Sequence, residues 1–366
     1  MTVVIAGGGL AGAAAACLLA RDGRDVTLLE RDVGPRDKIC GEFLSSEAVG
    51  YLAGLGVNVA AMGAAPIHAM RLIHGRAVAE TALPFVAAGL SRRVLDEALL
   101  RAAAAAGATV RRGVSVRGIA PGRVELVGET LTAPTLLLAT GKHDLRGSPR
   151  TPGAEPEALV GYKMYYTLKP AQTTALRGYV EIILFDGGYA GLQMIEGGAA
   201  NLCLLVHRRR LDAAGGWPAL LDALCRDSEH LAARLRGATP LLERPLTIFR
   251  VPYGYVHSAA GAGGVFRLGD QAAVIPSFCG DGMSIALHSA HRAAQVLRAG
   301  GDADAYHAQM RCDVGAPVRL AFGLYRATRS AVARTAMVAA CRRWPGLMRA
   351  VATRTRVPDA ALAATA

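Results

Sequence analysis

A glycine-rich turn near the start of the chain has the residue types and the spacing of a phosphate-binding loop. Gly7, Gly9 and Gly12 fit the pattern GxGxxG, after the β-branched run Thr2–Ala6 and before the Ala- and Leu-rich segment Leu10–Arg21. In such a strand–turn–helix unit the first glycine permits a tight turn, the second admits a diphosphate, and the third lets helix and strand pack closely. The helix N-terminus then offers free N–H groups to the phosphates.

An acidic residue follows at a distance that suits the same site. Asp25–Glu30 is predicted to be a second strand, and Glu30, at its end, comes 18 residues after Gly12. A carboxylate there can accept hydrogen bonds from ribose hydroxyls and repels a 2′-phosphate. Strand, turn, helix and acid together predict a dinucleotide site rather than a glycine-rich loop without a ligand.

A second glycine-rich segment lies near residue 280. Asp270 follows a predicted strand at 264–267, and the stretch PSFCGDGM at 276–283 leads into a predicted helix at 282–299. An aspartate after a strand can bond a ribityl hydroxyl, and a turn that feeds a helix N-terminus can direct N–H groups at an anionic reduced flavin. The alternative is a surface turn capped by Asp281.

Four motifs in this order resemble those of the FAD oxidoreductases of the para-hydroxybenzoate hydroxylase and geranylgeranyl reductase superfamily. They are GxGxxG with its acid, SRRxLDxxL at 91–99, a strand ending in ATG at 139–141, and the late GD…PxxxGxG. The run KICGE at 38–42 is similar to the KxCG stretch of geranylgeranyl reductase-like members. The resemblance spans roughly residues 1–300 and implies FAD as the cofactor, with NAD(P)H as the electron donor.

The resemblance also implies which residues hold FAD. The first glycine turn and Glu30 would bind the ADP half, Arg92 would lie against the phosphates, Asp270 would meet the ribityl chain, and the second glycine turn would meet the isoalloxazine ring. The full predicted set is Gly7, Gly9, Leu10, Ala11, Gly12, Glu30, Arg31, Lys38, Gly41, Arg92, Gly141, Gly269, Asp270, Pro276, Gly280, Gly282 and Met283.

Two side chains are candidates for catalysis. Cys40 lies in the loop that approaches the flavin in similar proteins, where a thiol could line the substrate pocket, donate a proton or tune the flavin; the alternative is a small buried hydrophobe. A redox pair with Cys279 is a further alternative. Tyr189 falls on a predicted sheet, where an aromatic residue either contacts substrate or packs. Lys142 and His143 follow the ATG strand, and we expect them to be surface charges.

Composition narrows the function classes. Of 366 residues, 52% are apolar and 19% are charged, which indicates a folded chain. The net charge is +12, but no basic run is interleaved with aromatic residues, so we expect no nucleic-acid partner. Seven cysteines without a CxxC pair argue against a disulfide framework or a structural zinc site, and no metal site is expected. We expect a cytoplasmic protein without a signal peptide or membrane span.

The element pattern predicts an α/β fold. We expect a Rossmann-type FAD-binding domain (glutathione-reductase-like) from 1–65, 88–150 and 255–300, and an inserted antiparallel β-sheet substrate domain from 66–87 and 151–254. A helical C-terminal region, 301–366, should be interrupted at Pro317 and Pro345. A strand at 109–119 and a helix at 217–237 are also predicted. The arginines mixed with apolar residues in the C-terminal helices suit either peripheral contact with a membrane surface or dimerisation.

The leading functional hypothesis is a flavin-dependent monooxygenase that hydroxylates a lipophilic or aromatic small molecule, such as a polyketide or quinone precursor. This chemistry needs no protein nucleophile, and the sequence has no clear acid/base set. The alternative is a carbon–carbon double-bond reductase or dehydrogenase, which KICGE favours, although the YxWxFP-like stretch of geranylgeranyl reductases is absent. A third hypothesis is a sensor that binds FAD or NAD without catalysis.

Overall fold

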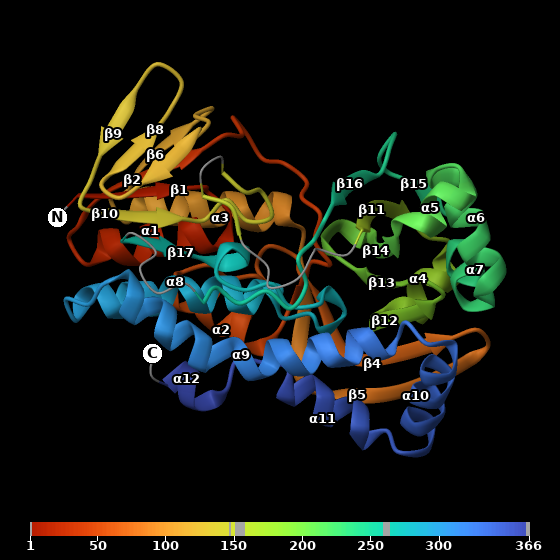
Figure 1. Ribbon diagram of the computed structural model, residues 1–366. Coiled ribbons are helices and arrows are strands. Elements are labelled where there is room, and N and C mark those ends of the chain that lie inside the picture. Colours follow the sequence, from red (N-terminus) through yellow and green to blue (C-terminus); the bar gives the residue numbers. More distant parts are fainter. Residues whose placement is uncertain (1, 146–147, 151–157, 259–263, 364–366) are drawn as a thin grey trace.

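The computed structural model describes residues 2–145, 148–150, 158–258 and 264–363 (Figure 1). Two large β-sheets lie side by side, one parallel and one mostly antiparallel, and the C-terminal helices run beneath both. Among the described residues, no helix combines the length and the apolar character that crossing a membrane requires.

The parallel sheet carries the first glycine turn. Its strand order is β17-β10-β1-β2-β6, and the helices α1, α3 and α8 pack together beside it. β1 is a continuous buried apolar run, as expected for a strand that is covered on both faces. The bounds are β1 Thr2–Ala6, β2 Asp25–Glu30, β6 Thr109–Arg112, β10 Thr135–Leu138, β17 Val265–Arg267, α1 Leu10–Arg21, α3 Arg92–Ala105 and α8 Gly282–Arg298.

The single strand predicted at 109–119 is wrong. Gly113 adopts a φ of 72°, which ends β6, and the chain then forms a separate three-stranded sheet. A left-handed backbone conformation cannot continue a strand, so β6 ends before this glycine. The small sheet consists of β7 Gly118–Ala120, β8 Arg123–Glu125 and β9 Thr130–Thr132.

The second sheet has nine strands, with β4 and β5 beside β12 and β13 at its centre. All neighbouring pairs are antiparallel except β12 and β4. The bounds are β3 Phe43–Leu44, β4 Ala65–His74, β5 Ala77–Gly89, β11 Leu159–Thr167, β12 Gly178–Phe185, β13 Gly188–Met194, β14 Ala200–His207, β15 Thr239–Pro240 and β16 Leu246–Phe249.

Short helices connect the strands. The helix predicted at 217–237 is broken at Ser228, whose hydroxyl accepts a hydrogen bond from Leu231 N and so caps a new helix. Ser45 caps α2 in the same way, because its side chain accepts a hydrogen bond from Ala48 N. The bounds are α2 Ser46–Gly54, α4 Pro170–Leu176, α5 Arg208–Ala214, α6 Trp217–Asp227 and α7 Glu229–Leu235, with 3₁₀ turns η1 Glu196–Gly198, η2 Gly269–Gln271 and η3 Ser277–Cys279.

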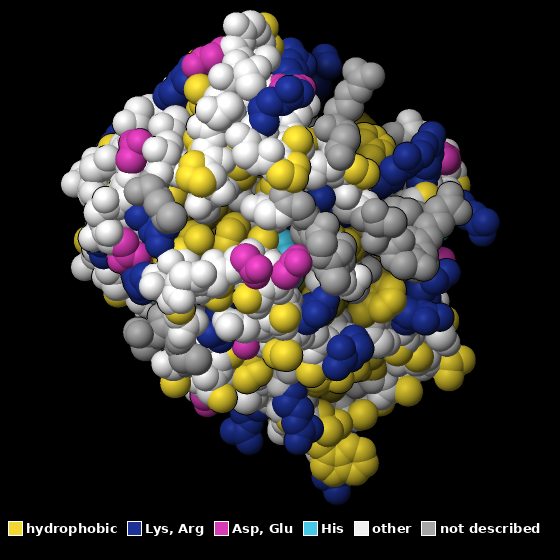
Figure 2. Space-filling model, turned by 60° about the vertical axis from the view of Figure 1, so that its left-hand side comes forward, with side chains coloured by type: hydrophobic (Ala, Val, Ile, Leu, Met, Phe, Trp, Pro, Cys, Tyr) yellow, Lys and Arg dark blue, Asp and Glu magenta, His cyan; other side chains and the backbone are white. Residues whose placement is uncertain are grey.

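The C-terminal helices lie against the second sheet. α10 and α11 contact β5, and α9 packs against α8 and β17. The predicted interruption at Pro317 is wrong: α9 continues through this buried proline, although a proline inside a helix removes a hydrogen bond and crowds the preceding turn. Pro345 does separate α10 from α11. In Figure 2, dark-blue and yellow side chains stand together along the lower edge, where these helices lie. The bounds are α9 Ala303–Ala327, α10 Ala331–Arg343, α11 Gly346–Arg354 and α12 Asp359–Ala363.

Candidate active site

The first glycine turn is tight on the side of the sheet and open on the other. A Cβ atom on Gly12 would lie 1.9 Å from the Gly7 carbonyl oxygen, and Gly7 itself has a φ of 108°. A Cβ on Gly9 would meet only the Arg92 guanidinium, at 3.3 Å. α1 begins directly after Gly9 without a side-chain cap, so its first N–H groups are available to an anion.

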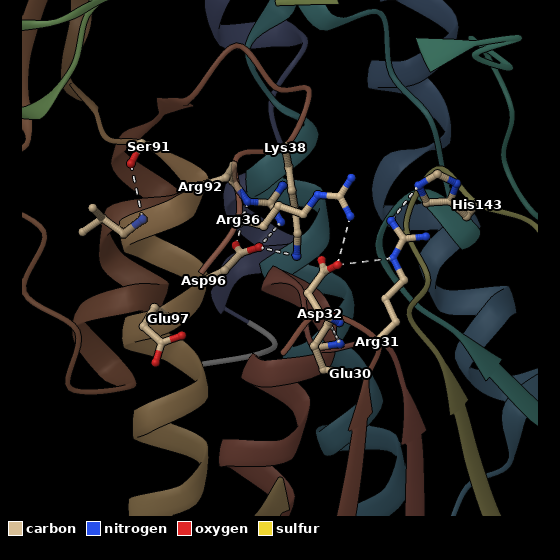
Figure 3. Close-up of polar contacts among 12 residues, drawn as sticks. Glu30, Arg31, Asp32, Arg36, Lys38, Ser91, Arg92, Asp96, Glu97 and His143 are labelled. Atoms are coloured by element: carbon tan, nitrogen blue, oxygen red, sulfur yellow. Dashed lines mark hydrogen bonds and ion pairs between the residues drawn. The ribbon is translucent and has the colours of Figure 1, made fainter. Parts of the chain in front are cut away.

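Glu30 is held at the edge of this turn. Its carboxylate is buried and accepts hydrogen bonds from Gly8 N at 2.7 Å and from Asp32 N at 2.9 Å. The acid therefore lies beside the glycine turn, as a residue that binds ribose hydroxyls must. Arg31 points away from it, toward the exposed His143, with 3.1 Å between Nη2 and Nε2 (Figure 3).

Two cations share one acid near this turn, and Figure 3 shows Arg92 and Lys38 meeting at Asp96. Arg92 donates to both oxygens of Asp96, at 2.7 and 2.9 Å, and Lys38 Nζ donates to Asp96 Oδ2 at 2.9 Å. Burial alone would raise the pKa of Asp96, but the charges of Arg92 and Lys38 outweigh it and lower that pKa. Because the acid fixes both cations in place, they are preorganised for an anionic group.

The second glycine turn lies across from the first. Gly269, with a φ of 59°, begins η2, and Gly280, with a φ of 77°, precedes α8. The Lys142 ammonium lies 3.3 Å from Asp270 Oδ2 and donates to the Ile39 carbonyl at 3.3 Å. Burial opposes the charge of Lys142, but nearby negative charge, Asp270 foremost, raises its pKa. Lys142 is thus part of the site, and the expectation that it is a surface charge was wrong.

The two turns enclose one cleft, called the glycine cleft below, with about 1070 Å³ of space that protein atoms do not fill. Twelve of the predicted residues line it: Gly9, Leu10, Ala11, Cys40, Gly41, Arg92, Gly141, Gly269, Asp270, Gly280, Gly282 and Met283. Gly7 and Gly12 shape the turn from behind. Five other predicted residues lie outside the lining: Glu30, Arg31, Lys38, Pro276 and Tyr189.

These residues fit FAD. The open side of Gly9, the N-terminus of α1 and Arg92 would hold the diphosphate, and Glu30 would hold the ribose. Asp270 would meet the ribityl hydroxyls, while Gly280, Gly282 and Met283 at the start of α8 would meet the ring. Because α8 presents its positive end there, it would stabilise negative charge on a reduced flavin.

The loop at 38–42 is held by the second sheet in a way that the sequence did not reveal. Glu42 adopts a φ of 59° and is buried, and its Oε1 accepts from Lys163 Nζ at 2.5 Å and from the Tyr165 hydroxyl at 2.8 Å. Burial raises the pKa of Glu42 despite the charge of Lys163. Gln193 and Asn201 bind carbonyl oxygens of the same loop. The only sequence signal was KICGE itself, because the partners come from strands far along the chain.

Cys40 lies in the wall of the glycine cleft, where its sulfur accepts a weak hydrogen bond from Glu42 N at 3.4 Å. Cys279 lines a neighbouring cavity and not the cleft. All seven cysteines are free thiols. The two sulfurs therefore face different spaces, and the structure gives a Cys40–Cys279 pair no support.

A second, larger cavity adjoins the cleft and is called the apolar cavity below. It holds about 1730 Å³ of space not filled by protein atoms and runs between the second sheet and α9, α10 and α11. Its walls are almost entirely apolar, for example Leu72, Ile182, Met337 and Met348. It shares Gly41, Phe43, Cys203, Ser277 and Gly280 with the glycine cleft, so the two spaces meet where the second glycine turn lies.

Three hydroxyl groups, the hydroxyl trio, stand where the two spaces meet. The Tyr189 oxygen lies 2.9 Å from that of Tyr253 and 2.6 Å from that of Ser277, and the latter two are 2.5 Å apart. Tyr189 lines the apolar cavity, Tyr253 lines the cleft, and Ser277 lines both. Burial raises the pKa of both tyrosines, so they hold their protons and act as neutral hydrogen-bonding groups. Tyr189 was predicted; Tyr253 and Ser277 were missed.

The C-terminal region is fastened to the second glycine turn. Asp281, just before α8, is buried and accepts a hydrogen bond from Arg356 Nη1 at 2.7 Å. Burial raises the pKa of Asp281 to about 7, although the charge of Arg356 opposes this. The Arg356 guanidinium also lies 4.0 Å from the centre of the Phe85 ring. Asp281 directly precedes α8, and Arg356 lines the apolar cavity. A substitution in this pair would therefore affect both the second glycine turn and the apolar cavity.

Comparison with known proteins agrees with this geometry. A family model described as an FAD binding domain matches residues 1–126. The chain is 27% identical over 324 residues to menaquinone reductase of Mycolicibacterium smegmatis, covering 82% of this chain and 77% of that protein. A stretch of 85 residues is 38% identical to squalene monooxygenase of Mus musculus, covering 23% of this chain and 15% of that protein.

Solved structures share the whole fold. A flavin-dependent brominase matches with a TM-score of 0.75 at 17% identity, covering 100% of this chain and 94% of that chain. At this identity the likeness concerns the fold alone. Together with the parallel sheet, the second sheet and the helical C-terminus, it confirms the predicted α/β fold class.

Proposed function

We propose that this chain, an FAD-dependent oxidoreductase of the para-hydroxybenzoate hydroxylase-like superfamily, hydroxylates the ring of a lipophilic small molecule. The observation that carries the proposal is the apolar cavity, which adjoins the ring end of the glycine cleft. A ring bound where the two spaces meet would lie beside the flavin, and an apolar tail would fill the cavity. Burying such a tail supplies binding energy without any polar contact.

FAD, when bound and reduced, supplies the activation of dioxygen. The chain's own residues would then have three tasks. The apolar walls exclude water from the reacting atoms, the hydroxyl trio binds an oxygen substituent of the ring, and the N-terminus of α8 favours a negatively charged flavin. None of these tasks needs a protein nucleophile. Since burial raises the pKa of Tyr189 and Tyr253, orientation by hydrogen bonds suits them better than acid catalysis.

A second candidate is reduction of a double bond or quinone in the same kind of substrate. It is favoured by the similarity over most of the chain to a protein named menaquinone reductase. In that reaction the substrate would take a hydride from the flavin, and the Cys40 thiol, which lines the cleft, would deliver the proton. The same cavity would accept a long apolar tail in either case.

Oxygen dependence separates the candidates. The purified flavoprotein would be reduced and mixed with isotopically labelled dioxygen and either a long-chain alkylphenol or a prenylated naphthoquinone. The proposal expects one labelled oxygen atom in the phenol product and no turnover without oxygen. Anaerobic reduction of the naphthoquinone would instead establish the second candidate. A flavin that is reoxidised by no substrate in either arm would contradict both and favour a sensor.

NAD(P)H as the electron donor belongs to the same proposal. The cleft offers Arg92 and Lys142 as cations for an anionic dinucleotide, and Lys38 lies beside Arg92 on Asp96, but all three already lie along the FAD site. A donor would therefore bind transiently at the open side of the cleft. Anaerobic mixing with NADH and with NADPH, followed by flavin absorbance, tests this: bleaching by neither would contradict it.

A further inference from the structure

Positive charge is concentrated in one stretch of the chain. Residues 314–358 contain nine of the chain's 41 basic residues and none of its 29 acidic ones, so this stretch accounts for +9 of the net charge of +12. It covers the second half of α9, all of α10 and α11, and the turn that follows. Seven of the nine are exposed: Arg319, Arg326, Arg329, Arg342, Arg343, Arg349 and Arg354.

The same stretch exposes large apolar side chains. Val332 is 80% exposed and Trp344 is 58% exposed, and Leu320 and Leu347 are also exposed. These four are nearly half of the large apolar residues that the described part of the chain exposes. The exposed apolar groups and arginines of residues 314–358, a stretch with no acid in its sequence, are together called the basic face below. Isolated exposed apolar residues need no explanation, but a cluster of them marks a contact surface.

The apolar cavity reaches the surface on this face. Leu320 on α9 and Leu347 on α11 are both exposed and both line the cavity, as does the exposed Arg354. The cavity mouth therefore lies between α9 and α11, within the basic face. The other end of the cavity meets the glycine cleft at Ser277 and Gly280.

We propose that the basic face docks on an anionic lipid bilayer, so that a lipophilic substrate passes from the bilayer through this mouth into the apolar cavity. The docking stands on the face alone, while the passage of substrate rests on the proposed function. Each arginine near an anionic membrane surface is attracted to it, and tryptophan favours the interface between headgroups and acyl chains. The helices lie on the surface and do not enter it deeply.

Nucleic acid is the other anionic partner that a basic face could bind, and the exposed apolar residues argue against it. Phosphate backbones are bound by cations and polar groups, and burying Val332, Leu320 and Leu347 against them would gain nothing. A bilayer accommodates both kinds of side chain at once. The cavity mouth adds a reason for apolar contact that nucleic acid does not supply.

The experiment is sedimentation of the FAD-loaded full chain with sucrose-filled vesicles. Vesicles of phosphatidylcholine alone are compared with vesicles that contain phosphatidylglycerol. We expect binding to the anionic vesicles that weakens as salt rises, because exposed charges are screened. The assay needs no turnover, so its outcome is independent of the proposed reaction.

Two surface variants and two matched controls sharpen the test. Arg342→Gln with Arg343→Gln should weaken vesicle binding about 30-fold, whereas Arg208→Gln with Arg209→Gln on α5 should leave it unchanged. Val332→Ser with Trp344→Ser should weaken it about tenfold, whereas Val127→Ser with Phe249→Ser, equally exposed elsewhere, should not. Turnover of substrate in detergent should stay constant in all four, because none of these residues lines the cleft or the cavity.

Four results would overturn the proposal. The protein could remain in the supernatant with anionic vesicles at low salt. The control variants could lose binding as much as the variants of the basic face. Duplex DNA could compete with vesicles while Val332→Ser with Trp344→Ser has no effect, which would identify a nucleic-acid surface. A dimer that hides Trp344 fluorescence from quencher in the absence of vesicles would likewise assign the face to a second copy.

Discussion

The glycine cleft takes its walls from turns, whereas the apolar cavity takes its walls from the faces of strands and helices. In the cleft, backbone conformation decides the shape: Gly7, Gly269 and Gly280 all have positive φ angles, and charged groups such as Arg92 are fixed by acids. In the cavity, apart from Gly280 at the junction with the cleft, side-chain size rather than backbone conformation decides how much space remains.

This difference teaches how the two spaces should respond to change. A cleft that binds a large charged cofactor by precise contacts has little tolerance, because each contact depends on one backbone position. A cavity that binds an apolar tail by area has more, since a methylene gained or lost changes the free energy of binding by less than about 1 kcal/mol. Substitutions in the cleft should therefore abolish binding of the cofactor, whereas substitutions in the cavity should change which substrates bind.

The largest effect is expected at Gly12. In Gly12→Ala the new Cβ would lie 1.9 Å from the Gly7 carbonyl oxygen, so α1 must move away from β1. We expect loss of bound flavin and a drop of more than about 3 kcal/mol in the free energy of unfolding. Flavin absorbance per polypeptide and urea unfolding measure both. Gly50→Ala is the control: it lies in α2 with open space around it, and should stabilise by up to about 1 kcal/mol. Equal behaviour of the two variants would show that the glycine turn tolerates a side chain.

Asp281 connects the two regions, and its titration should be visible in stability. Burial raises the pKa of Asp281 in the folded state to about 7 from its ordinary 3.8, so the folded state holds a proton that the unfolded state releases. Stability from this group is present at low pH and is lost as pH rises toward 7. Relative to Asp281→Asn, the wild type should lose about 3 kcal/mol between pH 5 and pH 8.

The control for this prediction is Asp313→Asn. Burial would raise the pKa of Asp313, but the hydrogen bond from His288 and the charge of Arg292 outweigh it and lower that pKa. Its contribution is lost only in acid, so the difference from wild type should be flat from pH 5 to pH 8. Urea unfolding at four pH values measures both differences. A flat difference for Asp281→Asn as well would mean that Asp281 is ionised throughout.

A substitution at Arg92 should have a smaller effect, which is limited to the affinity for FAD. Arg92→Gln removes a partly buried cation that faces the diphosphate side of the cleft but leaves Lys38 on Asp96. We expect FAD to bind about 30-fold more weakly, which is about 2 kcal/mol, the usual size of a hydrogen bond to a charged group. Titration of apoprotein with FAD, followed by quenching of flavin fluorescence, gives the dissociation constant. The control is Arg93→Gln at the exposed neighbour, which should bind FAD like the wild type. If Arg93→Gln weakens FAD binding equally, the effect of Arg92→Gln comes from net charge and not from its position.

Much of the cleft could be predicted from sequence because its information is local. The first strand, helix and second strand were predicted with their observed bounds, since valines, alanines and glycines at fixed spacing determine them. Lys142 and Glu42 were missed for the opposite reason. Each depends on a partner far away in sequence, Asp270 for the lysine and Lys163 for the glutamate, and no spacing rule links them.

The apolar cavity could not be predicted at all. Its walls take residues from β4, β5, β12, β13 and three C-terminal helices, which lie far apart along the chain, and in sequence most of these residues are ordinary apolar positions. A cavity is what packing leaves unfilled, and the pattern of apolar residues states only which side chains face inward. The continuous helix through Pro317 has the same origin, because tertiary contacts overrode the local signal.

The cavity itself offers the smallest effect and the sharpest comparison. Ala340 lines the apolar cavity, while its neighbour Ala339 is exposed and does not. Ala340→Phe should weaken binding of a long-chain alkylphenol about five- to tenfold, because the ring takes space that the tail needs. Binding of the methyl-substituted phenol should change less than about twofold, since a short substrate stays where the cleft and the cavity meet. Ala339→Phe should alter neither.

Perturbation of flavin absorbance gives both dissociation constants without turnover. A loss that is equal for long and short substrates would mean that the cavity does not hold the tail. Substrate recognition would then depend on the hydroxyl trio, which both substrates reach.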